Sequence, residues 1–185
     1  LMRDGKTQEA KLRSERALES MQNHKNPTPM MRNAWARHYD TLGQIAMGRN
    51  ELDDAHALFL AAQALRRVNG SISLLAHSTG NIAGVLALKG EWRNSAEAFE
   101  QVADQWASLG NLEMECIGRL NLIECLLELN ATEEVSERLR LEHLLLNTKE
   151  LVERLQSPQL SGIFEGHRER ALNAFASSPS ANQSC

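Results

Sequence analysis

Several features that mark other classes of protein are scarce or missing in this sequence. Only 4% of its 185 residues are aromatic, and 20 Lys and Arg stand against 24 Asp and Glu, for a net charge of −4. The basic residues form no concentrated block, which nucleic-acid binding requires, so we expect no direct contact with nucleic acid. The longest uncharged run, residues 68–88, is interrupted by Asn, Gly, Ser and His and is too polar to span a membrane.

The signatures of common catalytic and metal sites are also missing. The His residues are scattered, and neither HExxH, a phosphate-binding glycine loop nor GxSxG occurs. The acidic pairs Asp53–Asp54 and Glu133–Glu134 fall where helices should begin, and there carboxylates favour the positive end of the helix dipole. We therefore expect no enzyme activity, no cofactor and no metal site.

Cysteine is rare, and its spacing argues against redox or metal chemistry. Cys116, Cys125 and Cys185 include no CxxC pair, and the first two lie in apolar helical surroundings. Reduced, buried thiols are the expected state. Together with a charged N-terminal stretch that does not read as a secretory signal, these thiols favour a reducing, cytoplasmic location.

A helical hairpin that recurs about every forty residues is the main positive feature of the sequence. In residues 39–62, small and apolar residues repeat at helical spacing on two segments separated by Asn50. The first copy is carried by Tyr39, Leu42, Gly43, Ala46, Leu52, Ala55, Phe59 and Ala62. The second is carried by Thr79, Ile82, Ala83, Leu86, Gly90, Trp92, Ser95, Phe99 and Val102. A weaker third copy contains Leu122, Ile123, Leu126, Asn130, Val135 and Leu139.

The breaks between these segments define the expected organisation of the chain. Pro27 and Pro29 interrupt the helical pattern, and Gly70 suits a left-handed C-cap. The last long helix either continues through Asn147–Thr148 or stops there. We expect a second helix of an incomplete preceding repeat in 1–22, repeats in 30–69 and 71–109, a degenerate repeat in 111–146, capping helices in 147–176 and a disordered tail in 177–185.

The repeated pattern resembles the tetratricopeptide repeat (TPR), in the variety whose period is about forty residues. The resemblance covers about residues 5–139, although Ser14 stands where the partial first copy should carry an aromatic residue. It implies an all-α fold, a right-handed superhelical solenoid of stacked antiparallel hairpins. Stacking leaves apolar end faces, so a homo-oligomer or a complex joined through the solenoid ends is a possible assembly.

Close packing between the helices also follows from the residue types. Small residues are expected to let neighbouring helices approach, and large aromatic residues to fill the space between successive hairpins. The small positions are Gly43, Ala55, Ala83 and Ser95, and the large ones are Phe59, Trp92 and Phe99.

The resemblance implies a peptide-binding groove lined by the first helix of each hairpin. The best-known TPR ligand mode grips a terminal carboxylate with Lys and Arg, but the matching positions here hold Asp40, Gln44 and Ile117. Asn81 and Asn121 lie one period apart, where similar proteins hydrogen-bond a peptide backbone; a carboxamide offers both a donor and an acceptor. Bracing of the stack is an equally good interpretation of both. The candidate groove residues are Arg37, Asp40, Gln44, His77, Asn81, Gly84, Asn121, Glu124 and Glu128.

Two functions fit these observations. The first is a protein–protein interaction scaffold, part of a larger protein or complex, that binds a peptide segment of a partner in the groove. The second is a ligand- or peptide-sensing arm of a larger transcriptional or signalling regulator. In either case the acidic residues of the third copy would favour a ligand with some basic character.

Overall fold

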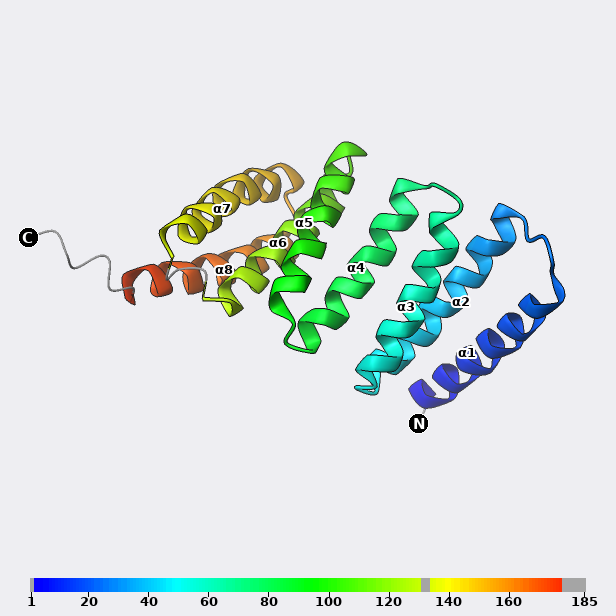
Figure 1. Ribbon diagram of the computed structural model, residues 1–185. Coiled ribbons are helices and arrows are strands. Elements are labelled where there is room, and N and C mark those ends of the chain that lie inside the picture. Colours follow the sequence, from blue (N-terminus) through cyan, green and yellow to red (C-terminus); the bar gives the residue numbers. More distant parts are fainter. Residues whose placement is uncertain (1, 131–133, 178–185) are drawn as a thin grey trace, which may run out of the picture. The chain divides into compact units, whose positions relative to one another are not determined.

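The computed structural model describes residues 2–130 and 134–177, and every regular element within these ranges is a helix. They are α1 (Met2–Glu19), the 3-10 helix η1 (Ser20–Asn23), α2 (Pro29–Gly48), α3 (Leu52–Arg67), α4 (Ile72–Leu88), α5 (Trp92–Ser108), α6 (Leu112–Glu128), α7 (Val135–Leu155) and α8 (Pro158–Ser177). The chain divides into two compact units, residues 1–90 (unit 1) and 91–185 (unit 2). Figure 1 shows consecutive helices folding back on one another within each unit. The expected all-α class is confirmed.

Residues in the left-handed conformation separate the helices at regular intervals. Asn50, Gly90 and Asn130 have φ angles of 62°, 76° and 52°, and Gly70 and Gly110 have φ angles of 69° and 68°. Gly and Asn adopt this conformation at the least steric cost, so each of them ends the helix before it. These positions fall twenty residues apart, which is the structural origin of the forty-residue period. Gly70 has the left-handed conformation that the sequence predicts, although the C-cap residue of α3 is Val68.

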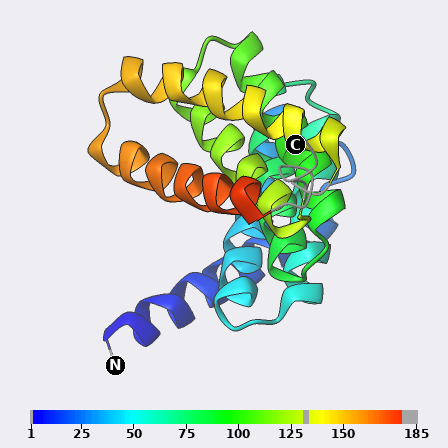
Figure 2. The same cartoon turned by 90° about the vertical axis from the view of Figure 1, so that its left-hand side faces the viewer.

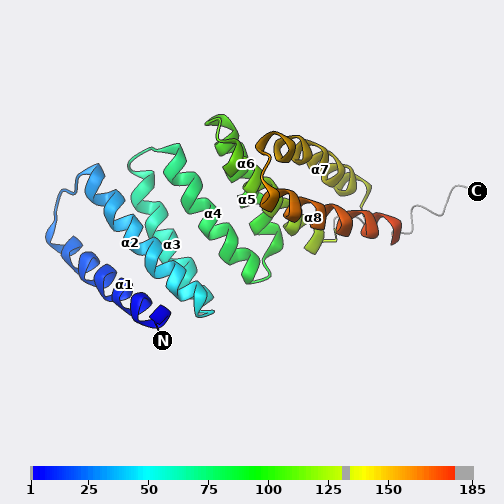
Figure 3. The same cartoon turned by 180° about the vertical axis from the view of Figure 1, so that it is seen from behind.

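The start of α2 is specified by the residues that precede it. Pro29 is the first residue of α2, where a missing N–H costs no hydrogen bond. The Thr28 side chain caps the helix by accepting a hydrogen bond of 3.2 Å from the Met31 N–H. Figure 3 shows the connecting segment between α1 and α2, which run in opposite directions.

The core of unit 1 is built where α2, α3 and α4 meet. It contains Ala46, Ala55, Phe59, Ile82, Val85 and Leu86. Phe59 is fully buried, and a Cβ added to Gly43 would lie 2.6 Å from the Phe59 ring. Glycine at position 43 is therefore what lets α2 approach the aromatic ring of α3, as the sequence predicts.

The core of unit 2 is built from α6, α7 and α8. It contains Cys116, Leu120, Leu151, Val152, Leu160 and Phe164. At the junction of α5 and α6, a Cβ on Gly118 would lie 3.2 Å from the Ala103 backbone. This second close approach is made by Gly118, whereas Ile123 stands in the third copy at the position where the first two copies have the small residues Gly43 and Ala83.

One helix, α7, runs without a break from Val135 to Leu155, so the chain does continue through Asn147–Thr148. The Thr148 side chain is buried and donates a hydrogen bond of 2.7 Å to the Leu144 carbonyl, which satisfies its hydroxyl within the helix. Figure 2 shows α7 and α8 running antiparallel. The expected boundary between residues 146 and 147 therefore falls inside a single helix.

The third copy does not bury the residues that its pattern predicts. Val135 and Leu139 are 67% and 59% exposed, whereas their counterparts in the first copy, Ala55 and Phe59, are fully buried. The interpretation of these two residues as core positions is wrong, because α7 turns another face inward. That face carries Leu141, Leu144, Thr148, Leu151 and Val152. The predicted tail, apart from Ser177, and the residues 131–133 lie outside the described residues.

Candidate functional site

Three of the candidate groove residues of unit 1, Asp40, Gln44 and Asn81, meet in a hydrogen-bonded network centred on a buried arginine. Arg66 in α3 is 2% exposed, pairs with the Asp40 carboxylate of α2, and donates a hydrogen bond of 2.6 Å to Ser78 in α4. Asp40 in turn accepts a hydrogen bond of 3.3 Å from the Asn81 carboxamide. The network therefore joins all three helices of the unit 1 core.

Both polar ends of the Asn81 side chain are occupied within unit 1. Its nitrogen donates to Asp40, and its oxygen accepts a hydrogen bond of 3.4 Å from Gln44. Gln44 is exposed, while Asn81 and Asp40 are half-buried. This arrangement favours the bracing interpretation for Asn81, since a peptide would have to break bonds that the fold already makes.

The remaining candidates of unit 1 leave polar groups and space at the surface. Arg37 and His77 are exposed, and neither side chain has a hydrogen bond or an ion pair within the described ranges. Gly84 lies on α4, and a Cβ placed on it would meet nothing within 4 Å. The side chains of Arg37 and His77 are therefore not engaged within the described fold, and the space beside Gly84 is open.

In unit 2, the acidic candidates are paired with α8. Arg170 contacts Glu124 at 2.5 Å and Glu128 at 2.7 Å, and His167 Nδ1 lies 3.1 Å from Glu124. Burial is the largest influence on His167 and lowers its pKa, while Glu124 opposes that shift. The acidic surface that the sequence indicated is thus largely neutralised by the chain itself.

Asn121 differs from Asn81 in its surroundings. It is exposed on α6, and its carboxamide has no hydrogen-bond partner among the residues that the structure describes. The two asparagines therefore occupy equivalent places in the sequence pattern, but only Asn81 is engaged within the fold.

The two described cysteines are unsuited to nucleophilic chemistry. Cys116 and Cys125 are free and buried, and burial raises the pKa of both thiols. Both remain protonated at neutral pH. Among the described residues, no group of three His, Cys, Asp or Glu side chains is placed to hold a metal ion.

The network residues that sequence reasoning missed are Arg66 and Ser78. A signal for Arg66 exists, because it continues the buried stripe of Ala55, Phe59 and Ala62 by one more helical turn. A charged residue on a buried stripe requires a partner, and Asp40 supplies it. The partner's identity could not be read from spacing alone.

None of the helices in the described part of the chain combines the length and the apolar character needed to cross a membrane. No protein-family model matches the sequence, and no curated protein matches it. Similarity is found among solved structures. The crystal structure of BtubC (BKLC) from P. vanneervenii has a TM-score of 0.65 at 16% identity, over 96% of this chain and 77% of that one.

A second similar structure is a putative kinesin light chain from Podosopora anserina with nearly identical TPR-like repeats. Its TM-score is 0.64 at 14% identity, over 98% of this chain and 92% of that one. At sequence identities of 16% and 14%, these two similarities show a common fold and nothing further. The chain has the fold of a TPR-like repeat solenoid.

Proposed function

We propose that this chain is a protein–protein interaction scaffold that binds a peptide segment of a partner protein. In unit 2, the first helix α6 would supply the contacts. The TPR-like fold supports the general role, since such repeats present long surfaces for partner proteins. The observation that carries the proposal is the exposed, unpaired carboxamide of Asn121, set in the repeat position that also holds Asn81.

The side chains divide into a bracing group and a binding group. Asn81, Asp40 and Gln44 brace unit 1, because their polar atoms are joined to each other. Asn121 is assigned to the binding group, where its amide would donate to a peptide carbonyl and accept from a peptide N–H. Within unit 1, the exposed Arg37 and His77 form a separate candidate surface, and Gly84 beside them on α4 has open space next to it.

The charge of the ligand follows from these assignments. Glu124 and Glu128 are held by Arg170, so they give little attraction to a basic peptide. We therefore propose a peptide recognised through its backbone, in a reducing cytoplasmic compartment, and not one selected for basic side chains.

Site-specific cross-linking tests this proposal directly. A photoreactive residue replaces Asn121 in one variant and Gln101, an exposed residue on α5, in a matched control. We expect the probe at position 121 to capture a partner protein from the native cell extract and the probe at 101 not to capture it. Equal capture at the two positions, or none at 121, would exclude this face as the binding site.

The captured segment then allows a quantitative test. Asn121→Ala should weaken its binding about tenfold, which corresponds to the loss of paired hydrogen bonds to one peptide unit. Asn81→Ala should instead lower the stability of unit 1 and change affinity less. If Asn121→Ala binds as tightly as the unaltered chain, backbone recognition by this residue is wrong.

A further inference from the structure

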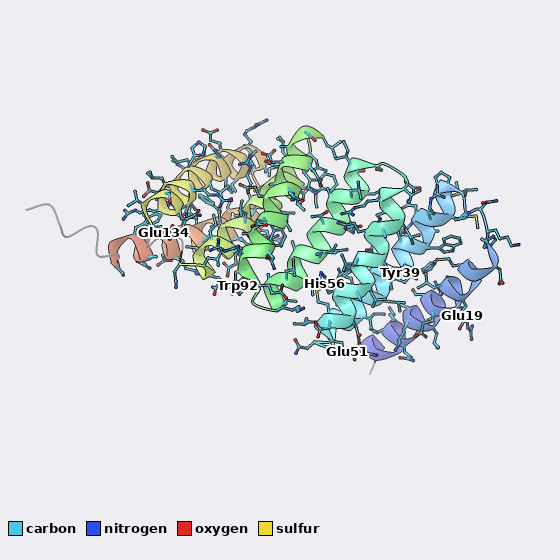
Figure 4. All side chains as sticks on the ribbon, in the orientation of Figure 1. Glu19, Tyr39, Glu51, His56, Trp92 and Glu134 are labelled. Carbon is cyan, nitrogen blue, oxygen red and sulfur yellow. The ribbon has the colours of Figure 1, made fainter. Side chains whose placement is uncertain are left out.

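A large open cleft lies where the first half of α1 packs against the second half of α2. Its volume is about 910 Å³, which is ample for a small organic ligand. Figure 4 labels Glu51, just beyond the end of α2, at the end of unit 1 where the cleft lies. The side chains that line the cleft include Lys6, Gln8, Ala10, Thr41, Ile45 and Arg49.

The charge of this α1–α2 cleft is unlike that of the clefts beside it and elsewhere in the chain. None of its described lining residues is acidic, whereas two are basic. The neighbouring cleft between α1, α2 and α3 is lined by Glu15, Glu51 and Asp54, and three glutamates line a cleft between α5, α6 and α7. The chain as a whole carries a net charge of −4. A cleft lined by positive charge alone favours a negatively charged ligand.

The two cations of the α1–α2 cleft are not neutralised by the fold. Lys6 and Arg49 are exposed, and neither side chain makes an ion pair or a hydrogen bond with any residue that the structure describes. On the same helix as Lys6, by contrast, Arg13 is paired with Glu9 at 2.9 Å. Two positive charges without a partner therefore line one cleft.

The neutral groups around these cations also suit an anion. The Gln8 side chain is exposed, and its amide has no hydrogen-bond partner in the described ranges. At the end of α2, the Ala46 carbonyl accepts hydrogen bonds of 3.0 Å and 2.9 Å from the N–H groups of Arg49 and Glu51. Carbonyl groups at the negative end of a helix repel anions, and here this carbonyl is already engaged by two donors.

The number of free charges selects the kind of anion. A phosphate monoester carries a charge of about −2 and three acceptor oxygens at neutral pH, whereas a carboxylate carries one charge and two oxygens. An arginine guanidinium also matches the geometry of phosphate oxygens. We propose that the α1–α2 cleft binds a phosphate monoester, with the phosphate oxygens held by Lys6, Gln8 and Arg49. Ala10 and Ile45 line the same cleft and would contact the organic part of the ligand.

This site goes beyond the proposed peptide binding, because Lys6 and Arg49 belong to unit 1 and Asn121 belongs to unit 2. Loss of phosphate binding therefore leaves the peptide proposal standing, and the reverse also holds. A small organic phosphate and a phosphorylated serine side chain both present the proposed group. Because the two cations are exposed, we expect inorganic phosphate alone to bind weakly, with a Kd of about 1–10 mM.

Nuclear magnetic resonance titration of the full chain at constant ionic strength tests the proposal. The ligands are inorganic phosphate, glycerol phosphate, N-acetyl-phosphoserine amide and, as the singly charged comparison, acetate. We expect the three phosphates to cause saturable shifts of the amides of residues 6–10 and 44–49, and acetate to bind about tenfold more weakly. Tighter binding of either ester supports the site and identifies the kind of phosphate that it takes. No saturation by any phosphate up to about 50 mM, or equal binding of acetate, would overturn the proposal.

Charge-removing variants locate the binding in the cleft. Lys6→Gln and Arg49→Gln should each raise the Kd for phosphate about threefold to tenfold. Arg16→Gln is the matched control, because Arg16 is also exposed on α1 without an ion pair in the described part of the chain, but it does not line the cleft. It removes the same charge, so an effect of net charge alone would appear in all three variants. Amide shifts far from the cleft check that each variant folds. Equal weakening by Arg16→Gln, or unchanged binding in both cleft variants, would overturn the proposal.

Discussion

The contact between Gly43 and Phe59 gives a quantitative test of how the first hairpin packs. Gly43→Ala adds one methyl group whose carbon would lie 2.6 Å from Cε1 and 2.9 Å from Cδ1 and Cζ of the Phe59 ring. Replacing a helical glycine by alanine would by itself stabilise α2 by about 1 kcal/mol. Overpacking against a fully buried ring costs about 1–3 kcal/mol, so we expect a net destabilisation of about 0–2 kcal/mol.

Gly84→Ala is the matched control, because Gly84 also lies inside a helix but an added Cβ meets nothing within 4 Å. It should stabilise unit 1 by about 0.5–1 kcal/mol. Urea unfolding gives the free energies, and hydrogen exchange of the α2 and α3 amides assigns the changes to unit 1. The Phe59→Leu substitution should lower the free energy of unfolding by less in the Gly43→Ala chain than in the unaltered chain, because it removes the ring that the added methyl group meets. A Gly43→Ala chain as stable as the Gly84→Ala chain would refute the close-packing argument.

Three further predictions concern stability. Arg66→Met leaves the Asp40 carboxylate without its buried partner and should lower the free energy of unfolding, measured in urea, by about 3 kcal/mol. Adding Asp40→Asn should restore part of that loss. Burial lowers the pKa of His38 and of His167, so the unfolded chain binds protons first as pH falls. Stability should therefore decrease as pH drops below about 6.5, and thermal unfolding at several pH values measures the loss. Leu139→Gln should change stability by less than about 0.5 kcal/mol, because Leu139 is exposed; a larger loss would contradict the observed orientation of α7.

The helices and turns of this fold are predictable because their causes are local. Gly70, Gly90 and Gly110 end their helices through a conformation that other residues adopt at a cost, and this information lies within a few residues of each turn. Gly43 could be identified as a contact point because its partner, Phe59, lies in the same hairpin. Predicting these features therefore requires no information about distant parts of the chain.

The state of the candidate site depends on side chains far apart in the sequence. Glu124 and Arg170 are separated by 46 positions, and their pairing at 2.5 Å removes charge that the sequence pattern would leave to a ligand. Likewise, Asn81 and Asn121 match in spacing, but only Asn81 has Asp40 beside it. A repeat pattern assigns equivalent positions, whereas the availability of a polar group depends on which neighbour already binds it.

The third repeat shows why a pattern alone does not choose between two faces of one helix. Val135, Leu139 and Leu146 fall within about 40° on one side of α7, and the buried set that includes Leu141 and Leu151 falls on the opposite side. Both sets satisfy helical periodicity, so α7 by itself has two candidate core faces. The inward face is the one that packs with α8, whose Leu160 and Phe164 complete the unit 2 core. The packing that turns Leu139 outward also places α8 where Arg170 reaches Glu124 and Glu128. The helix arrangement that corrects the repeat assignment therefore pairs the two acidic residues within the fold, while the Asn121 carboxamide has no partner among the described residues.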